Sequence, residues 1–275
     1  MTKNSLPLPK TWRNTDQDLS DEEWVLIADL FPTWSGGGSM GRPAKHNKRD
    51  IVNAILHVAA TGMQWRSLPD RYPNWSTVNR YHVEWSRDGT WERVADRLRQ
   101  LVRVEAGHDP APSASIIDAR SVRGASTVTS ATRGYDAGKK ISGRKTFGLV
   151  DTLGLLIAVV VVAASTSDNA GGIEVFNAGK RKSRRLTKVW CDAGFKKTFV
   201  EHCRRRNVDA EVVTKIHPGE FVVEPQRWII ERTWSWFMNN RRVQIDYERD
   251  PVVHAGFVWV AETRMLLRRL TNHSQ

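Results

Sequence analysis

The sequence is short of cysteines, of acidic residues relative to basic ones, and of long apolar runs. Its 275 residues include two cysteines, Cys191 and Cys203, and neither belongs to a Cys-x-x-Cys pair. We therefore expect no zinc site and no disulfide, and two reduced thiols in a reducing cytosol. The longest apolar run, residues 155–164, is too short to cross a bilayer and fits a buried strand. The first residues lack an apolar stretch, so no secretory signal is expected.

The shortage of acidic residues leaves the chain strongly basic. Its formal net charge is +12 and its pI is about 10.0. Such a charge indicates a polyanionic partner, most simply DNA or RNA. A ribosomal or membrane-surface protein would share this charge, but no basic amphipathic anchor stands out. Hydrophobic residues make up 40% of the chain, which is enough for a substantial core.

The N-terminal third has helical periodicity. Residues 1–18 are polar and predicted to be a flexible N-terminus, and Ser20 opens a capping box with Glu23. Apolar residues then recur at helical spacing through residues 19–105, which predicts a small all-helical domain. Its predicted helices 48–61 and 76–87 form a pair similar to a helix-turn-helix. Residues 106–114 are rich in proline and predicted to be a linker.

The pattern changes to short apolar runs in residues 115–275. The strands that it predicts are 115–122, 145–151, 155–164, 187–191 and 210–214. Helices are predicted at 168–178, 196–206, 226–241 and 251–270. Three strands followed by alternating helices and strands indicate an α/β domain, with a mixed five-stranded sheet flanked by helices.

Three carboxylates lie where apolar segments give way to polar residues. They are Asp118 and Asp192, at the ends of predicted strands, and Glu231, on a predicted helix. A buried carboxylate is costly unless it is paired or holds a metal, so the set predicts a cation-binding acidic pocket. Taken alone, each of them is better explained as an ordinary cap or a surface ion pair. Asp151 and Asp168 are interpreted as a turn residue and a helix N-cap.

Several segments, in order along the chain, carry a resemblance to a known family. They are residues 19–24, 41–43, 62–78, 117–122, 143–156, 191–195, 227–236 and 241–248. Together they resemble the DDE transposases of bacterial insertion sequences, in the insertion-sequence four/five group, over roughly residues 19–270. Family members often carry a Tyr seven residues before the glutamate and a Lys seven after it, where this chain has Glu224 and Met238. Phe147 stands where many relatives have a His.

The resemblance implies an RNase H-like catalytic domain over residues 115–275 and a DNA-binding role for residues 19–105. It implies that Asp118, Asp192 and Glu231 are catalytic and bind two Mg²⁺ ions, with Mn²⁺ able to substitute. The implied partner is double-stranded DNA, as transposon ends and target, held by a homodimer or larger assembly. The implied reaction cleaves DNA at terminal inverted repeats and joins the freed end to a target. We expect a cytoplasmic protein associated with the nucleoid, without a membrane partner.

Six arginines are candidates for DNA contact, with a solvated charged face as the alternative. They are Arg227, Arg232, Arg241, Arg242, Arg42 and Arg80. Trp234 and Trp236, beside the predicted glutamate, are interpreted first as core residues and second as stacking platforms for a base. The basic segment 180–185 is a further candidate for contact with flanking DNA.

Two other functions stay open at this point. One is a catalytically silent DNA-binding relative, such as a domesticated or decayed transposase. The intact Asp118, Asp192 and Glu231 argue against it. The other is an RNase H-like nuclease without strand transfer, and the helical N-terminal region, which suggests recognition of specific ends, argues against that one.

Overall fold

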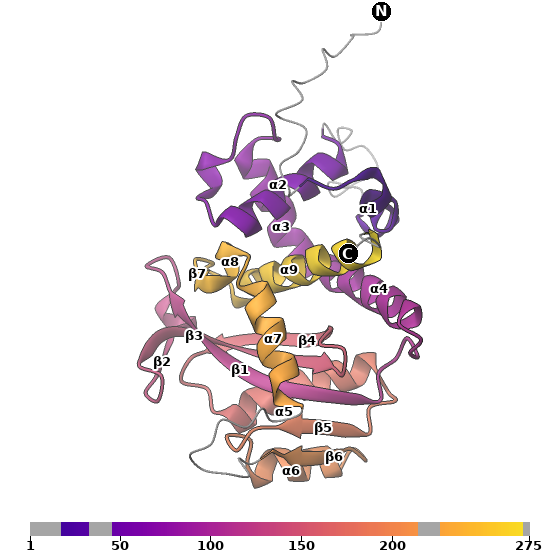
Figure 1. Ribbon diagram of the computed structural model, residues 1–275. Helices are drawn as coiled ribbons and strands as arrows, with labels where there is room; N and C mark the ends of the chain where they lie inside the picture. The colour runs from indigo at the N-terminus through magenta and orange to yellow at the C-terminus, as the bar shows by residue number, and fades with distance from the viewer. Residues whose placement is uncertain (1–17, 33–45, 214–225, 272–275) are drawn as a thin grey trace, which may run out of the picture.

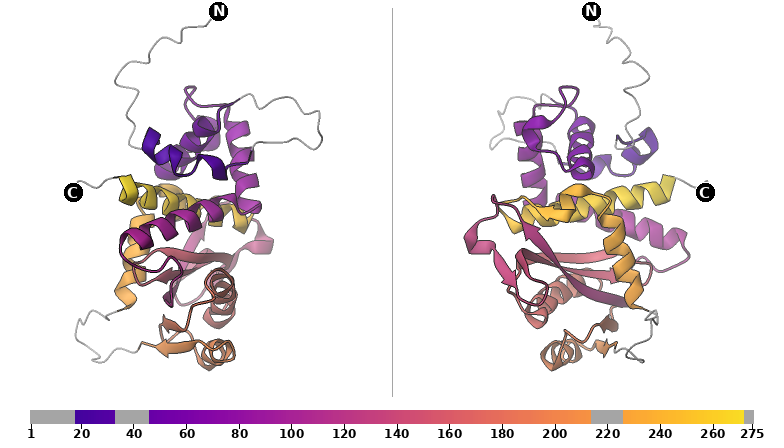
Figure 2. Two further views of the ribbon diagram at one scale, coloured as in Figure 1. Left: turned by 90° about the vertical axis from the view of Figure 1, so that its right-hand side faces the viewer. Right: turned by 60° about the vertical axis from the view of Figure 1, so that its left-hand side comes forward.

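The computed structural model describes residues 18–32, 46–213 and 226–271. Helices from the first third of the chain form one end of the molecule, and a sheet flanked by helices forms the other (Figure 1). The C-terminal helix lies between the two parts and contacts both (Figures 1 and 2). No helix in the described segments is long and apolar enough to span a membrane.

The helical part contains four α-helices among the described residues. They are α1 (Asp21–Val25), α2 (Lys48–Thr61), α3 (Trp75–Arg87) and α4 (Thr90–Glu105), with short 3₁₀ turns at Ala28–Leu30 and Trp65–Ser67. The predicted capping box of Ser20 and Glu23 is confirmed, and α2 has the predicted bounds. Helix α3 begins earlier than expected, because the Asn74 side chain, rather than Ser76, caps its N-terminus.

Seven strands of the described chain form one mixed sheet. They are β1 (Ala114–Gly124), β2 (Gly134–Asp136), β3 (Ile141–Asp151), β4 (Leu156–Ala163), β5 (Lys188–Cys191), β6 (Asp209–Val212) and β7 (Ile245–Asp246). The main order is β4-β3-β1-β5-β6; β3 is antiparallel to β1 and β4, whereas β5 and β6 run parallel to β1. All five predicted strands are present. The count of five was too low, because β2 and β7 are too short to carry a hydrophobic pattern.

Helices cover both faces of the sheet. The helices α5 (Asp168–Lys182) and α6 (Lys197–Arg204) pack through one hydrophobic cluster that includes Ile117 of β1. On the opposite face lie α7 (Arg227–Phe237), the short α8 (Arg241–Gln244) and α9 (Pro251–Thr271). The predicted single helix over 226–241 is therefore two helices, interrupted at residues 238–240.

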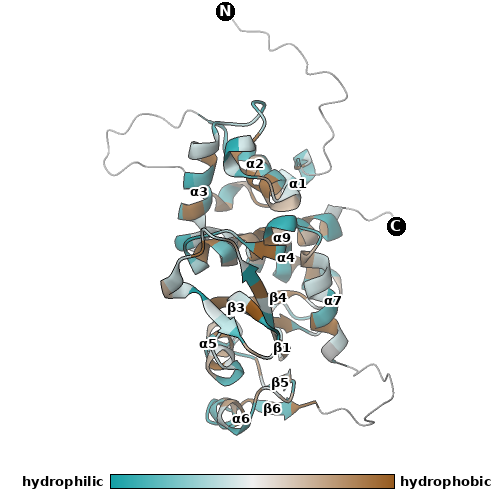
Figure 3. Ribbon diagram, turned by 90° about the vertical axis from the view of Figure 1, so that its left-hand side faces the viewer, coloured by the Kyte–Doolittle hydropathy of each residue, from teal (hydrophilic) through white to brown (hydrophobic). Residues whose placement is uncertain are grey.

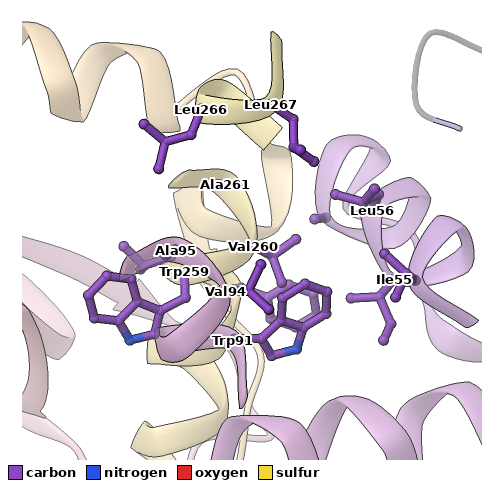
Figure 4. Packing of buried hydrophobic residues seen from close by; sticks show 14 of the residues in the cluster. Ile55, Leu56, Trp91, Val94, Ala95, Trp259, Val260, Ala261, Leu266 and Leu267 are labelled. Atoms are coloured by element: carbon purple, nitrogen blue, oxygen red, sulfur yellow. The ribbon is translucent and has the colours of Figure 1, made fainter. Parts of the chain in front are cut away.

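A continuous core joins the helical part to the sheet. Helix α9 packs against α2, α3, α4 and β4, and its apolar side chains meet those of α2 and α4 (Figure 4). Apolar residues gather along these inner faces and polar residues on the outer ones (Figure 3). The predicted boundaries between residues 19–105, 106–114 and 115–275 stay a prediction, because the packing gives one cluster across them.

Candidate active site

Asp118 lies in the middle of β1, and not at the end of a strand as expected, on the face of the sheet that α7 covers. Side chains alternate along a strand, so Asp118 shares a face with Ile116 and Arg120. Ile116 belongs to the cluster that contains α7 residues, whereas Ile117 packs with α5 and α6. The strand pattern therefore directs the Asp118 carboxylate towards α7.

A tryptophan from α7 holds the Asp118 carboxylate. The indole Nε1 of Trp234 donates a hydrogen bond to Asp118 Oδ2 over 3.1 Å. Gly148, opposite Asp118 in β3, makes room for this contact, since a methyl group there would lie 2.6 Å from Trp234 Cζ2. Trp234 is 7% exposed and packs edge-on against Phe237, in agreement with the core role expected for it.

Asp192 follows immediately after β5, the strand that lies next to β1. The two strands run parallel with Ile116 opposite Trp190, so extending the register by two residues puts Asp118 beside Asp192. Neighbouring strands lie about 4.8 Å apart, which is a short distance for two carboxylates. Asp192 Oδ1 accepts a hydrogen bond of 2.8 Å from the amide of Gly194, which fixes the turn at the end of the strand.

Asp168 is a further carboxylate that lies beside this turn. It was expected to cap α5, but Ser167 caps that helix, and Asp168 is its first residue. Asp168 Oδ1 lies 3.2 Å from Lys145 Nζ. Its other oxygen borders Gly194, where a methyl group would lie 2.7 Å from Asp168 Oδ2 and 2.9 Å from Asp192 Oδ1. The adjacent Ser167 and Asp168 were the available signal, because both residue types favour the N-cap and only one of them can occupy it.

Glu231 is exposed on α7, one helical turn before Trp234. Residues three apart share a helix face, so Glu231 lies near the Trp234 side of the helix. In the described part of the chain, however, no three His, Cys, Asp or Glu side chains are grouped closely enough to hold a metal ion. Continuing the β1–β5 register puts Asp118 beside Asp192, but Glu231 does not complete a three-carboxylate metal site with them in the described part of the chain.

The donor set suits a hard divalent cation. Carboxylate oxygens are the ligands that Mg²⁺ prefers, and Asp118 and Asp192 supply them from neighbouring strands. Like charges this close disfavour each other unless a cation lies between them. Lys145, 8% exposed, already neutralises Asp168 in part. The arrangement therefore fits a cation at the Asp118–Asp192 pair.

Two predicted DNA-contact arginines are held by protein groups. Arg242, 6% exposed, is bound by Glu248 Oε1 at 2.7 Å and donates to the carbonyl of Met63 at 3.2 Å. Its guanidinium is turned inwards and bound by protein groups, and its contact with DNA stays a prediction. Arg232 donates to the carbonyl of Leu153 at 3.2 Å and stacks between aromatic rings of α7.

The structure describes the other four arginines to different extents. Arg80 on α3 and Arg241 on α8 are exposed and remain candidates for DNA contact. Arg227 begins α7, and its side chain lies outside the described part of the molecule. Arg42 lies outside the described residues altogether.

The two cysteines and Asp151 have structural roles. Cys191 and Cys203 are free and buried, and burial raises the pKa of each thiol to about 12, which keeps both unreactive. Asp151 is fully buried and accepts from the amides of Leu153 and Leu155 through Oδ1, and Arg103 binds its other oxygen. The interpretation of Asp151 as a turn residue is confirmed.

Comparison with known proteins identifies the family. A family model described as "Transposase DDE domain" matches residues 109–265, more than half of the chain. A second, described as "Putative transposase of IS4/5 family", matches residues 19–95. The uncharacterized protein y4sN of Sinorhizobium fredii is 32% identical over 89 residues, which are 32% of this chain and 65% of that protein. The chain thus spans just under two thirds of that relative's length.

A second relative comes from an insertion element. The "Insertion element IS402 uncharacterized 16.2 kDa protein" of Burkholderia cepacia is 31% identical over 109 residues, which are 38% of this chain and 72% of that protein. Both family matches fall on the parts of the fold described above, one on the helical part and one on the sheet with its carboxylates. The chain therefore belongs to the IS4/5 family of transposases with a DDE domain.

Proposed function

We propose that this protein binds the terminal inverted repeats of its own insertion sequence, cleaves the DNA there and joins the freed 3′ end to a target. The observation that carries the proposal is the parallel register of β1 and β5, which, continued two residues past Ile116 and Trp190, aligns Asp118 with Asp192. The strand order of the sheet, β4-β3-β1-β5-β6 with β3 antiparallel to β1 and β4, supports an RNase H-like fold.

The proposed metal ligands are Asp118, Asp192 and Glu231. Two Mg²⁺ ions, or Mn²⁺ in their place, would activate the attacking oxygen and stabilise the leaving oxygen when bound. The parallel pairing of β1 with β5 supports Asp118 and Asp192 as neighbouring ligands.

Neighbouring residues position these ligands. The indole of Trp234 orients Asp118 by its hydrogen bond, and the Gly194 amide orients Asp192. Lys145 holds Asp168 next to Asp192 and limits the negative charge at the turn. Arg120 lies on the same face of β1 as Asp118, where burial lowers the pKa of its guanidinium; it supplies positive charge for a phosphate near that carboxylate.

The partner is double-stranded DNA, as transposon ends and as target. A net charge of +12 supports such binding. Because two ends must be held together, we propose a homodimer or larger assembly in the DNA complex. A cytoplasmic location on the nucleoid follows from a DNA substrate of this kind.

A cleavage assay tests the proposal. Linear DNA that carries the gene with its native flanks is incubated with purified protein and Mg²⁺ or Mn²⁺, and new 3′ ends are mapped. Asp192→Asn and Glu231→Gln are run in parallel, with Glu211→Gln as a matched control, since Glu211 lies on β6 and pairs with Lys188. The expected result is paired cuts at inverted repeats that need the metal and both carboxylates, and that survive in the control.

Two other outcomes would point to the alternative functions. Specific binding to the flanks without any cut would support a silent DNA-binding relative. Cutting that is independent of sequence, without strand transfer, would support a plain nuclease.

A further inference from the structure

A row of stacked planar side chains runs along α7 and onto α9. The guanidinium of Arg232 lies over the ring of Trp228 at 4.4 Å and over that of Trp236 at 4.5 Å from the ring centroids. Arg269 of α9 lies over the same Trp236 ring at 4.8 Å. We call Trp228, Arg232, Trp236 and Arg269 the stacked row.

The stacked row borders the proposed catalytic glutamate. Trp228, Arg232 and Trp236 are four residues apart, so they follow one stripe of the helix. Glu231 directly precedes Arg232 and lies between this stripe and Trp234, which faces the sheet. With about 1.5 Å of rise per residue, Trp236 is only about 7 Å along the axis from Glu231. Trp228 is 40% exposed, so the outer end of the row is open to a partner.

The inner end of the stacked row opens into a pocket of about 560 Å³. Its polar lining comes from Trp236, Asn239, Asn240, Arg264, Arg268 and Arg269. None of its lining residues, all of them within the described part of the chain, is acidic. The charge of Arg264 is offset by Glu23, with an N–O distance of 3.0 Å. The net lining is therefore positive, and its size is within the range of pockets for small ligands or nucleotides.

The arginines of the stacked row are electrostatically suited to an anion. The guanidinium groups of Arg232 and Arg269 both lie over the ring of Trp236, at 4.5 Å and 4.8 Å from its centroid. Two positively charged guanidinium groups on one indole repel each other, and a bound phosphate would reduce this repulsion. A guanidinium that stacks on a ring still has its in-plane N–H groups available, and this is the geometry with which arginine binds phosphate.

We propose that the stacked row and its pocket bind backbone phosphates of the DNA strand next to the cleavage site, with a phosphate in the pocket bound by Arg268 and Arg269. This inference rests on the proposed function and deepens it, because it assigns to the DNA a path along α7 past Glu231. Asn239 and Asn240 supply amide groups for the sugar or base edge beside that phosphate.

The experiment measures the affinity of the full chain for a fluorescein-labelled duplex from the gene's flanks, by anisotropy over a salt series in EDTA. Without divalent metal, no cleavage can influence the result. Arg268→Ala/Arg269→Ala is expected to bind about tenfold more weakly and to lower the slope of log affinity against log salt by roughly 2, about one unit for each lost phosphate contact. Arg93→Ala/Arg97→Ala on α4, with the same change of charge, is the control and is expected to behave like the wild type.

A second measurement needs no variant. Phenylglyoxal modifies accessible arginines, and mass spectrometry of the wild type is expected to find Arg268 and Arg269 protected when the duplex is bound. This result would stand even if the double variant folded poorly. Unchanged affinity and salt slope in a folded double variant, or equal modification with and without DNA, would overturn the inference while leaving the proposed function intact. A wild type that binds no DNA at all would overturn both.

Discussion

The indole Nε1 of Trp234 and the carboxylate of Asp118 are joined by a hydrogen bond of 3.1 Å across 116 residues of sequence. This hydrogen bond connects α7 to the middle of β1. It relates the helix that carries Glu231 to the strand that carries the first proposed metal ligand, so the geometry of the site depends on it.

Trp234→Phe is expected to lower DNA cleavage while the fold is retained. Phenylalanine keeps most of the buried ring but cannot donate to Asp118. Small displacements of reacting groups are costly, and we expect a roughly ten- to hundredfold lower single-turnover rate. Loss of the donor should cost about 1–3 kcal/mol of stability in urea unfolding. Trp259→Phe, also buried but on α9 rather than α7, is the control; an equal loss of rate in both variants would contradict the prediction.

Gly148→Ala tests the same contact from the opposite strand. The added methyl group would lie 2.6 Å from Cζ2 and 2.9 Å from Cη2 of Trp234, so the indole must move. Overpacking of this kind typically costs about 1–3 kcal/mol, and unfolding in urea measures it. Gly138→Ala is the control, since its added methyl group would meet only Asp136 Oδ1 at 3.5 Å. Equal stability of the two variants would count against the close packing of Trp234 on β3.

Local patterns predicted the elements well, and contacts between distant residues less well. The bounds of α2 and the presence of five strands follow from hydrophobic periodicity and capping residues, which are properties of short segments. The sequence also pointed to Asp118 and Asp192, because each lies where an apolar strand becomes polar. Their adjacency depends on strand order, which the family resemblance implied.

Side-chain environments could not be predicted in the same way. Arg242 was expected to contact DNA, yet it is buried against Glu248 and the Met63 carbonyl, which only the packing of α8 on α2 brings near. Asp168 was interpreted as a cap, but the preceding serine takes that role and frees it to meet Lys145. Arg242 and Asp168 thus each contact residues from another part of the fold, which the local sequence does not reveal.

Glu262 is expected to make stability depend on pH. It is fully buried on α9, and burial raises its pKa to about 8. Its Oε1 accepts from the Leu156 amide at 2.9 Å, while Oε2 has no hydrogen-bond partner in the described part of the molecule. The folded state therefore keeps a proton that the unfolded state releases near the ordinary pKa of 4.5. The stabilising effect of this proton is complete below that pH and is lost as the pH rises towards 8.

Glu262→Gln, which imitates the neutral form, should remove this dependence. In urea unfolding between pH 5 and 8, the wild type is expected to lose up to about 1.4 kcal/mol per pH unit relative to the variant. The variant should equal the wild type near pH 5 and exceed it near pH 8. Parallel profiles for the two proteins would show that Glu262 is ionised in the folded state.

Arg144 and Asp246 form a fully buried ion pair whose disruption should be costly. Arg144 Nη1 lies 2.8 Å from Asp246 Oδ2, and the same guanidinium donates to the carbonyls of Glu248 and Arg249. Arg144→Met would leave the Asp246 charge buried without this partner, and such losses are about 3–5 kcal/mol. Arg123→Met, exposed on the neighbouring strand, should change stability by less than about 0.5 kcal/mol.

The double variant Arg144→Met/Asp246→Asn separates the charge from the packing. Removing both charges eliminates the uncompensated carboxylate, so the double variant is expected to be more stable than Arg144→Met alone. Asparagine also keeps an oxygen for the Glu248 amide, which donates to Asp246 Oδ1 over 2.8 Å. A double variant less stable than Arg144→Met alone would contradict the prediction, because it would show that the Asp246 carboxylate stabilises the fold even without Arg144.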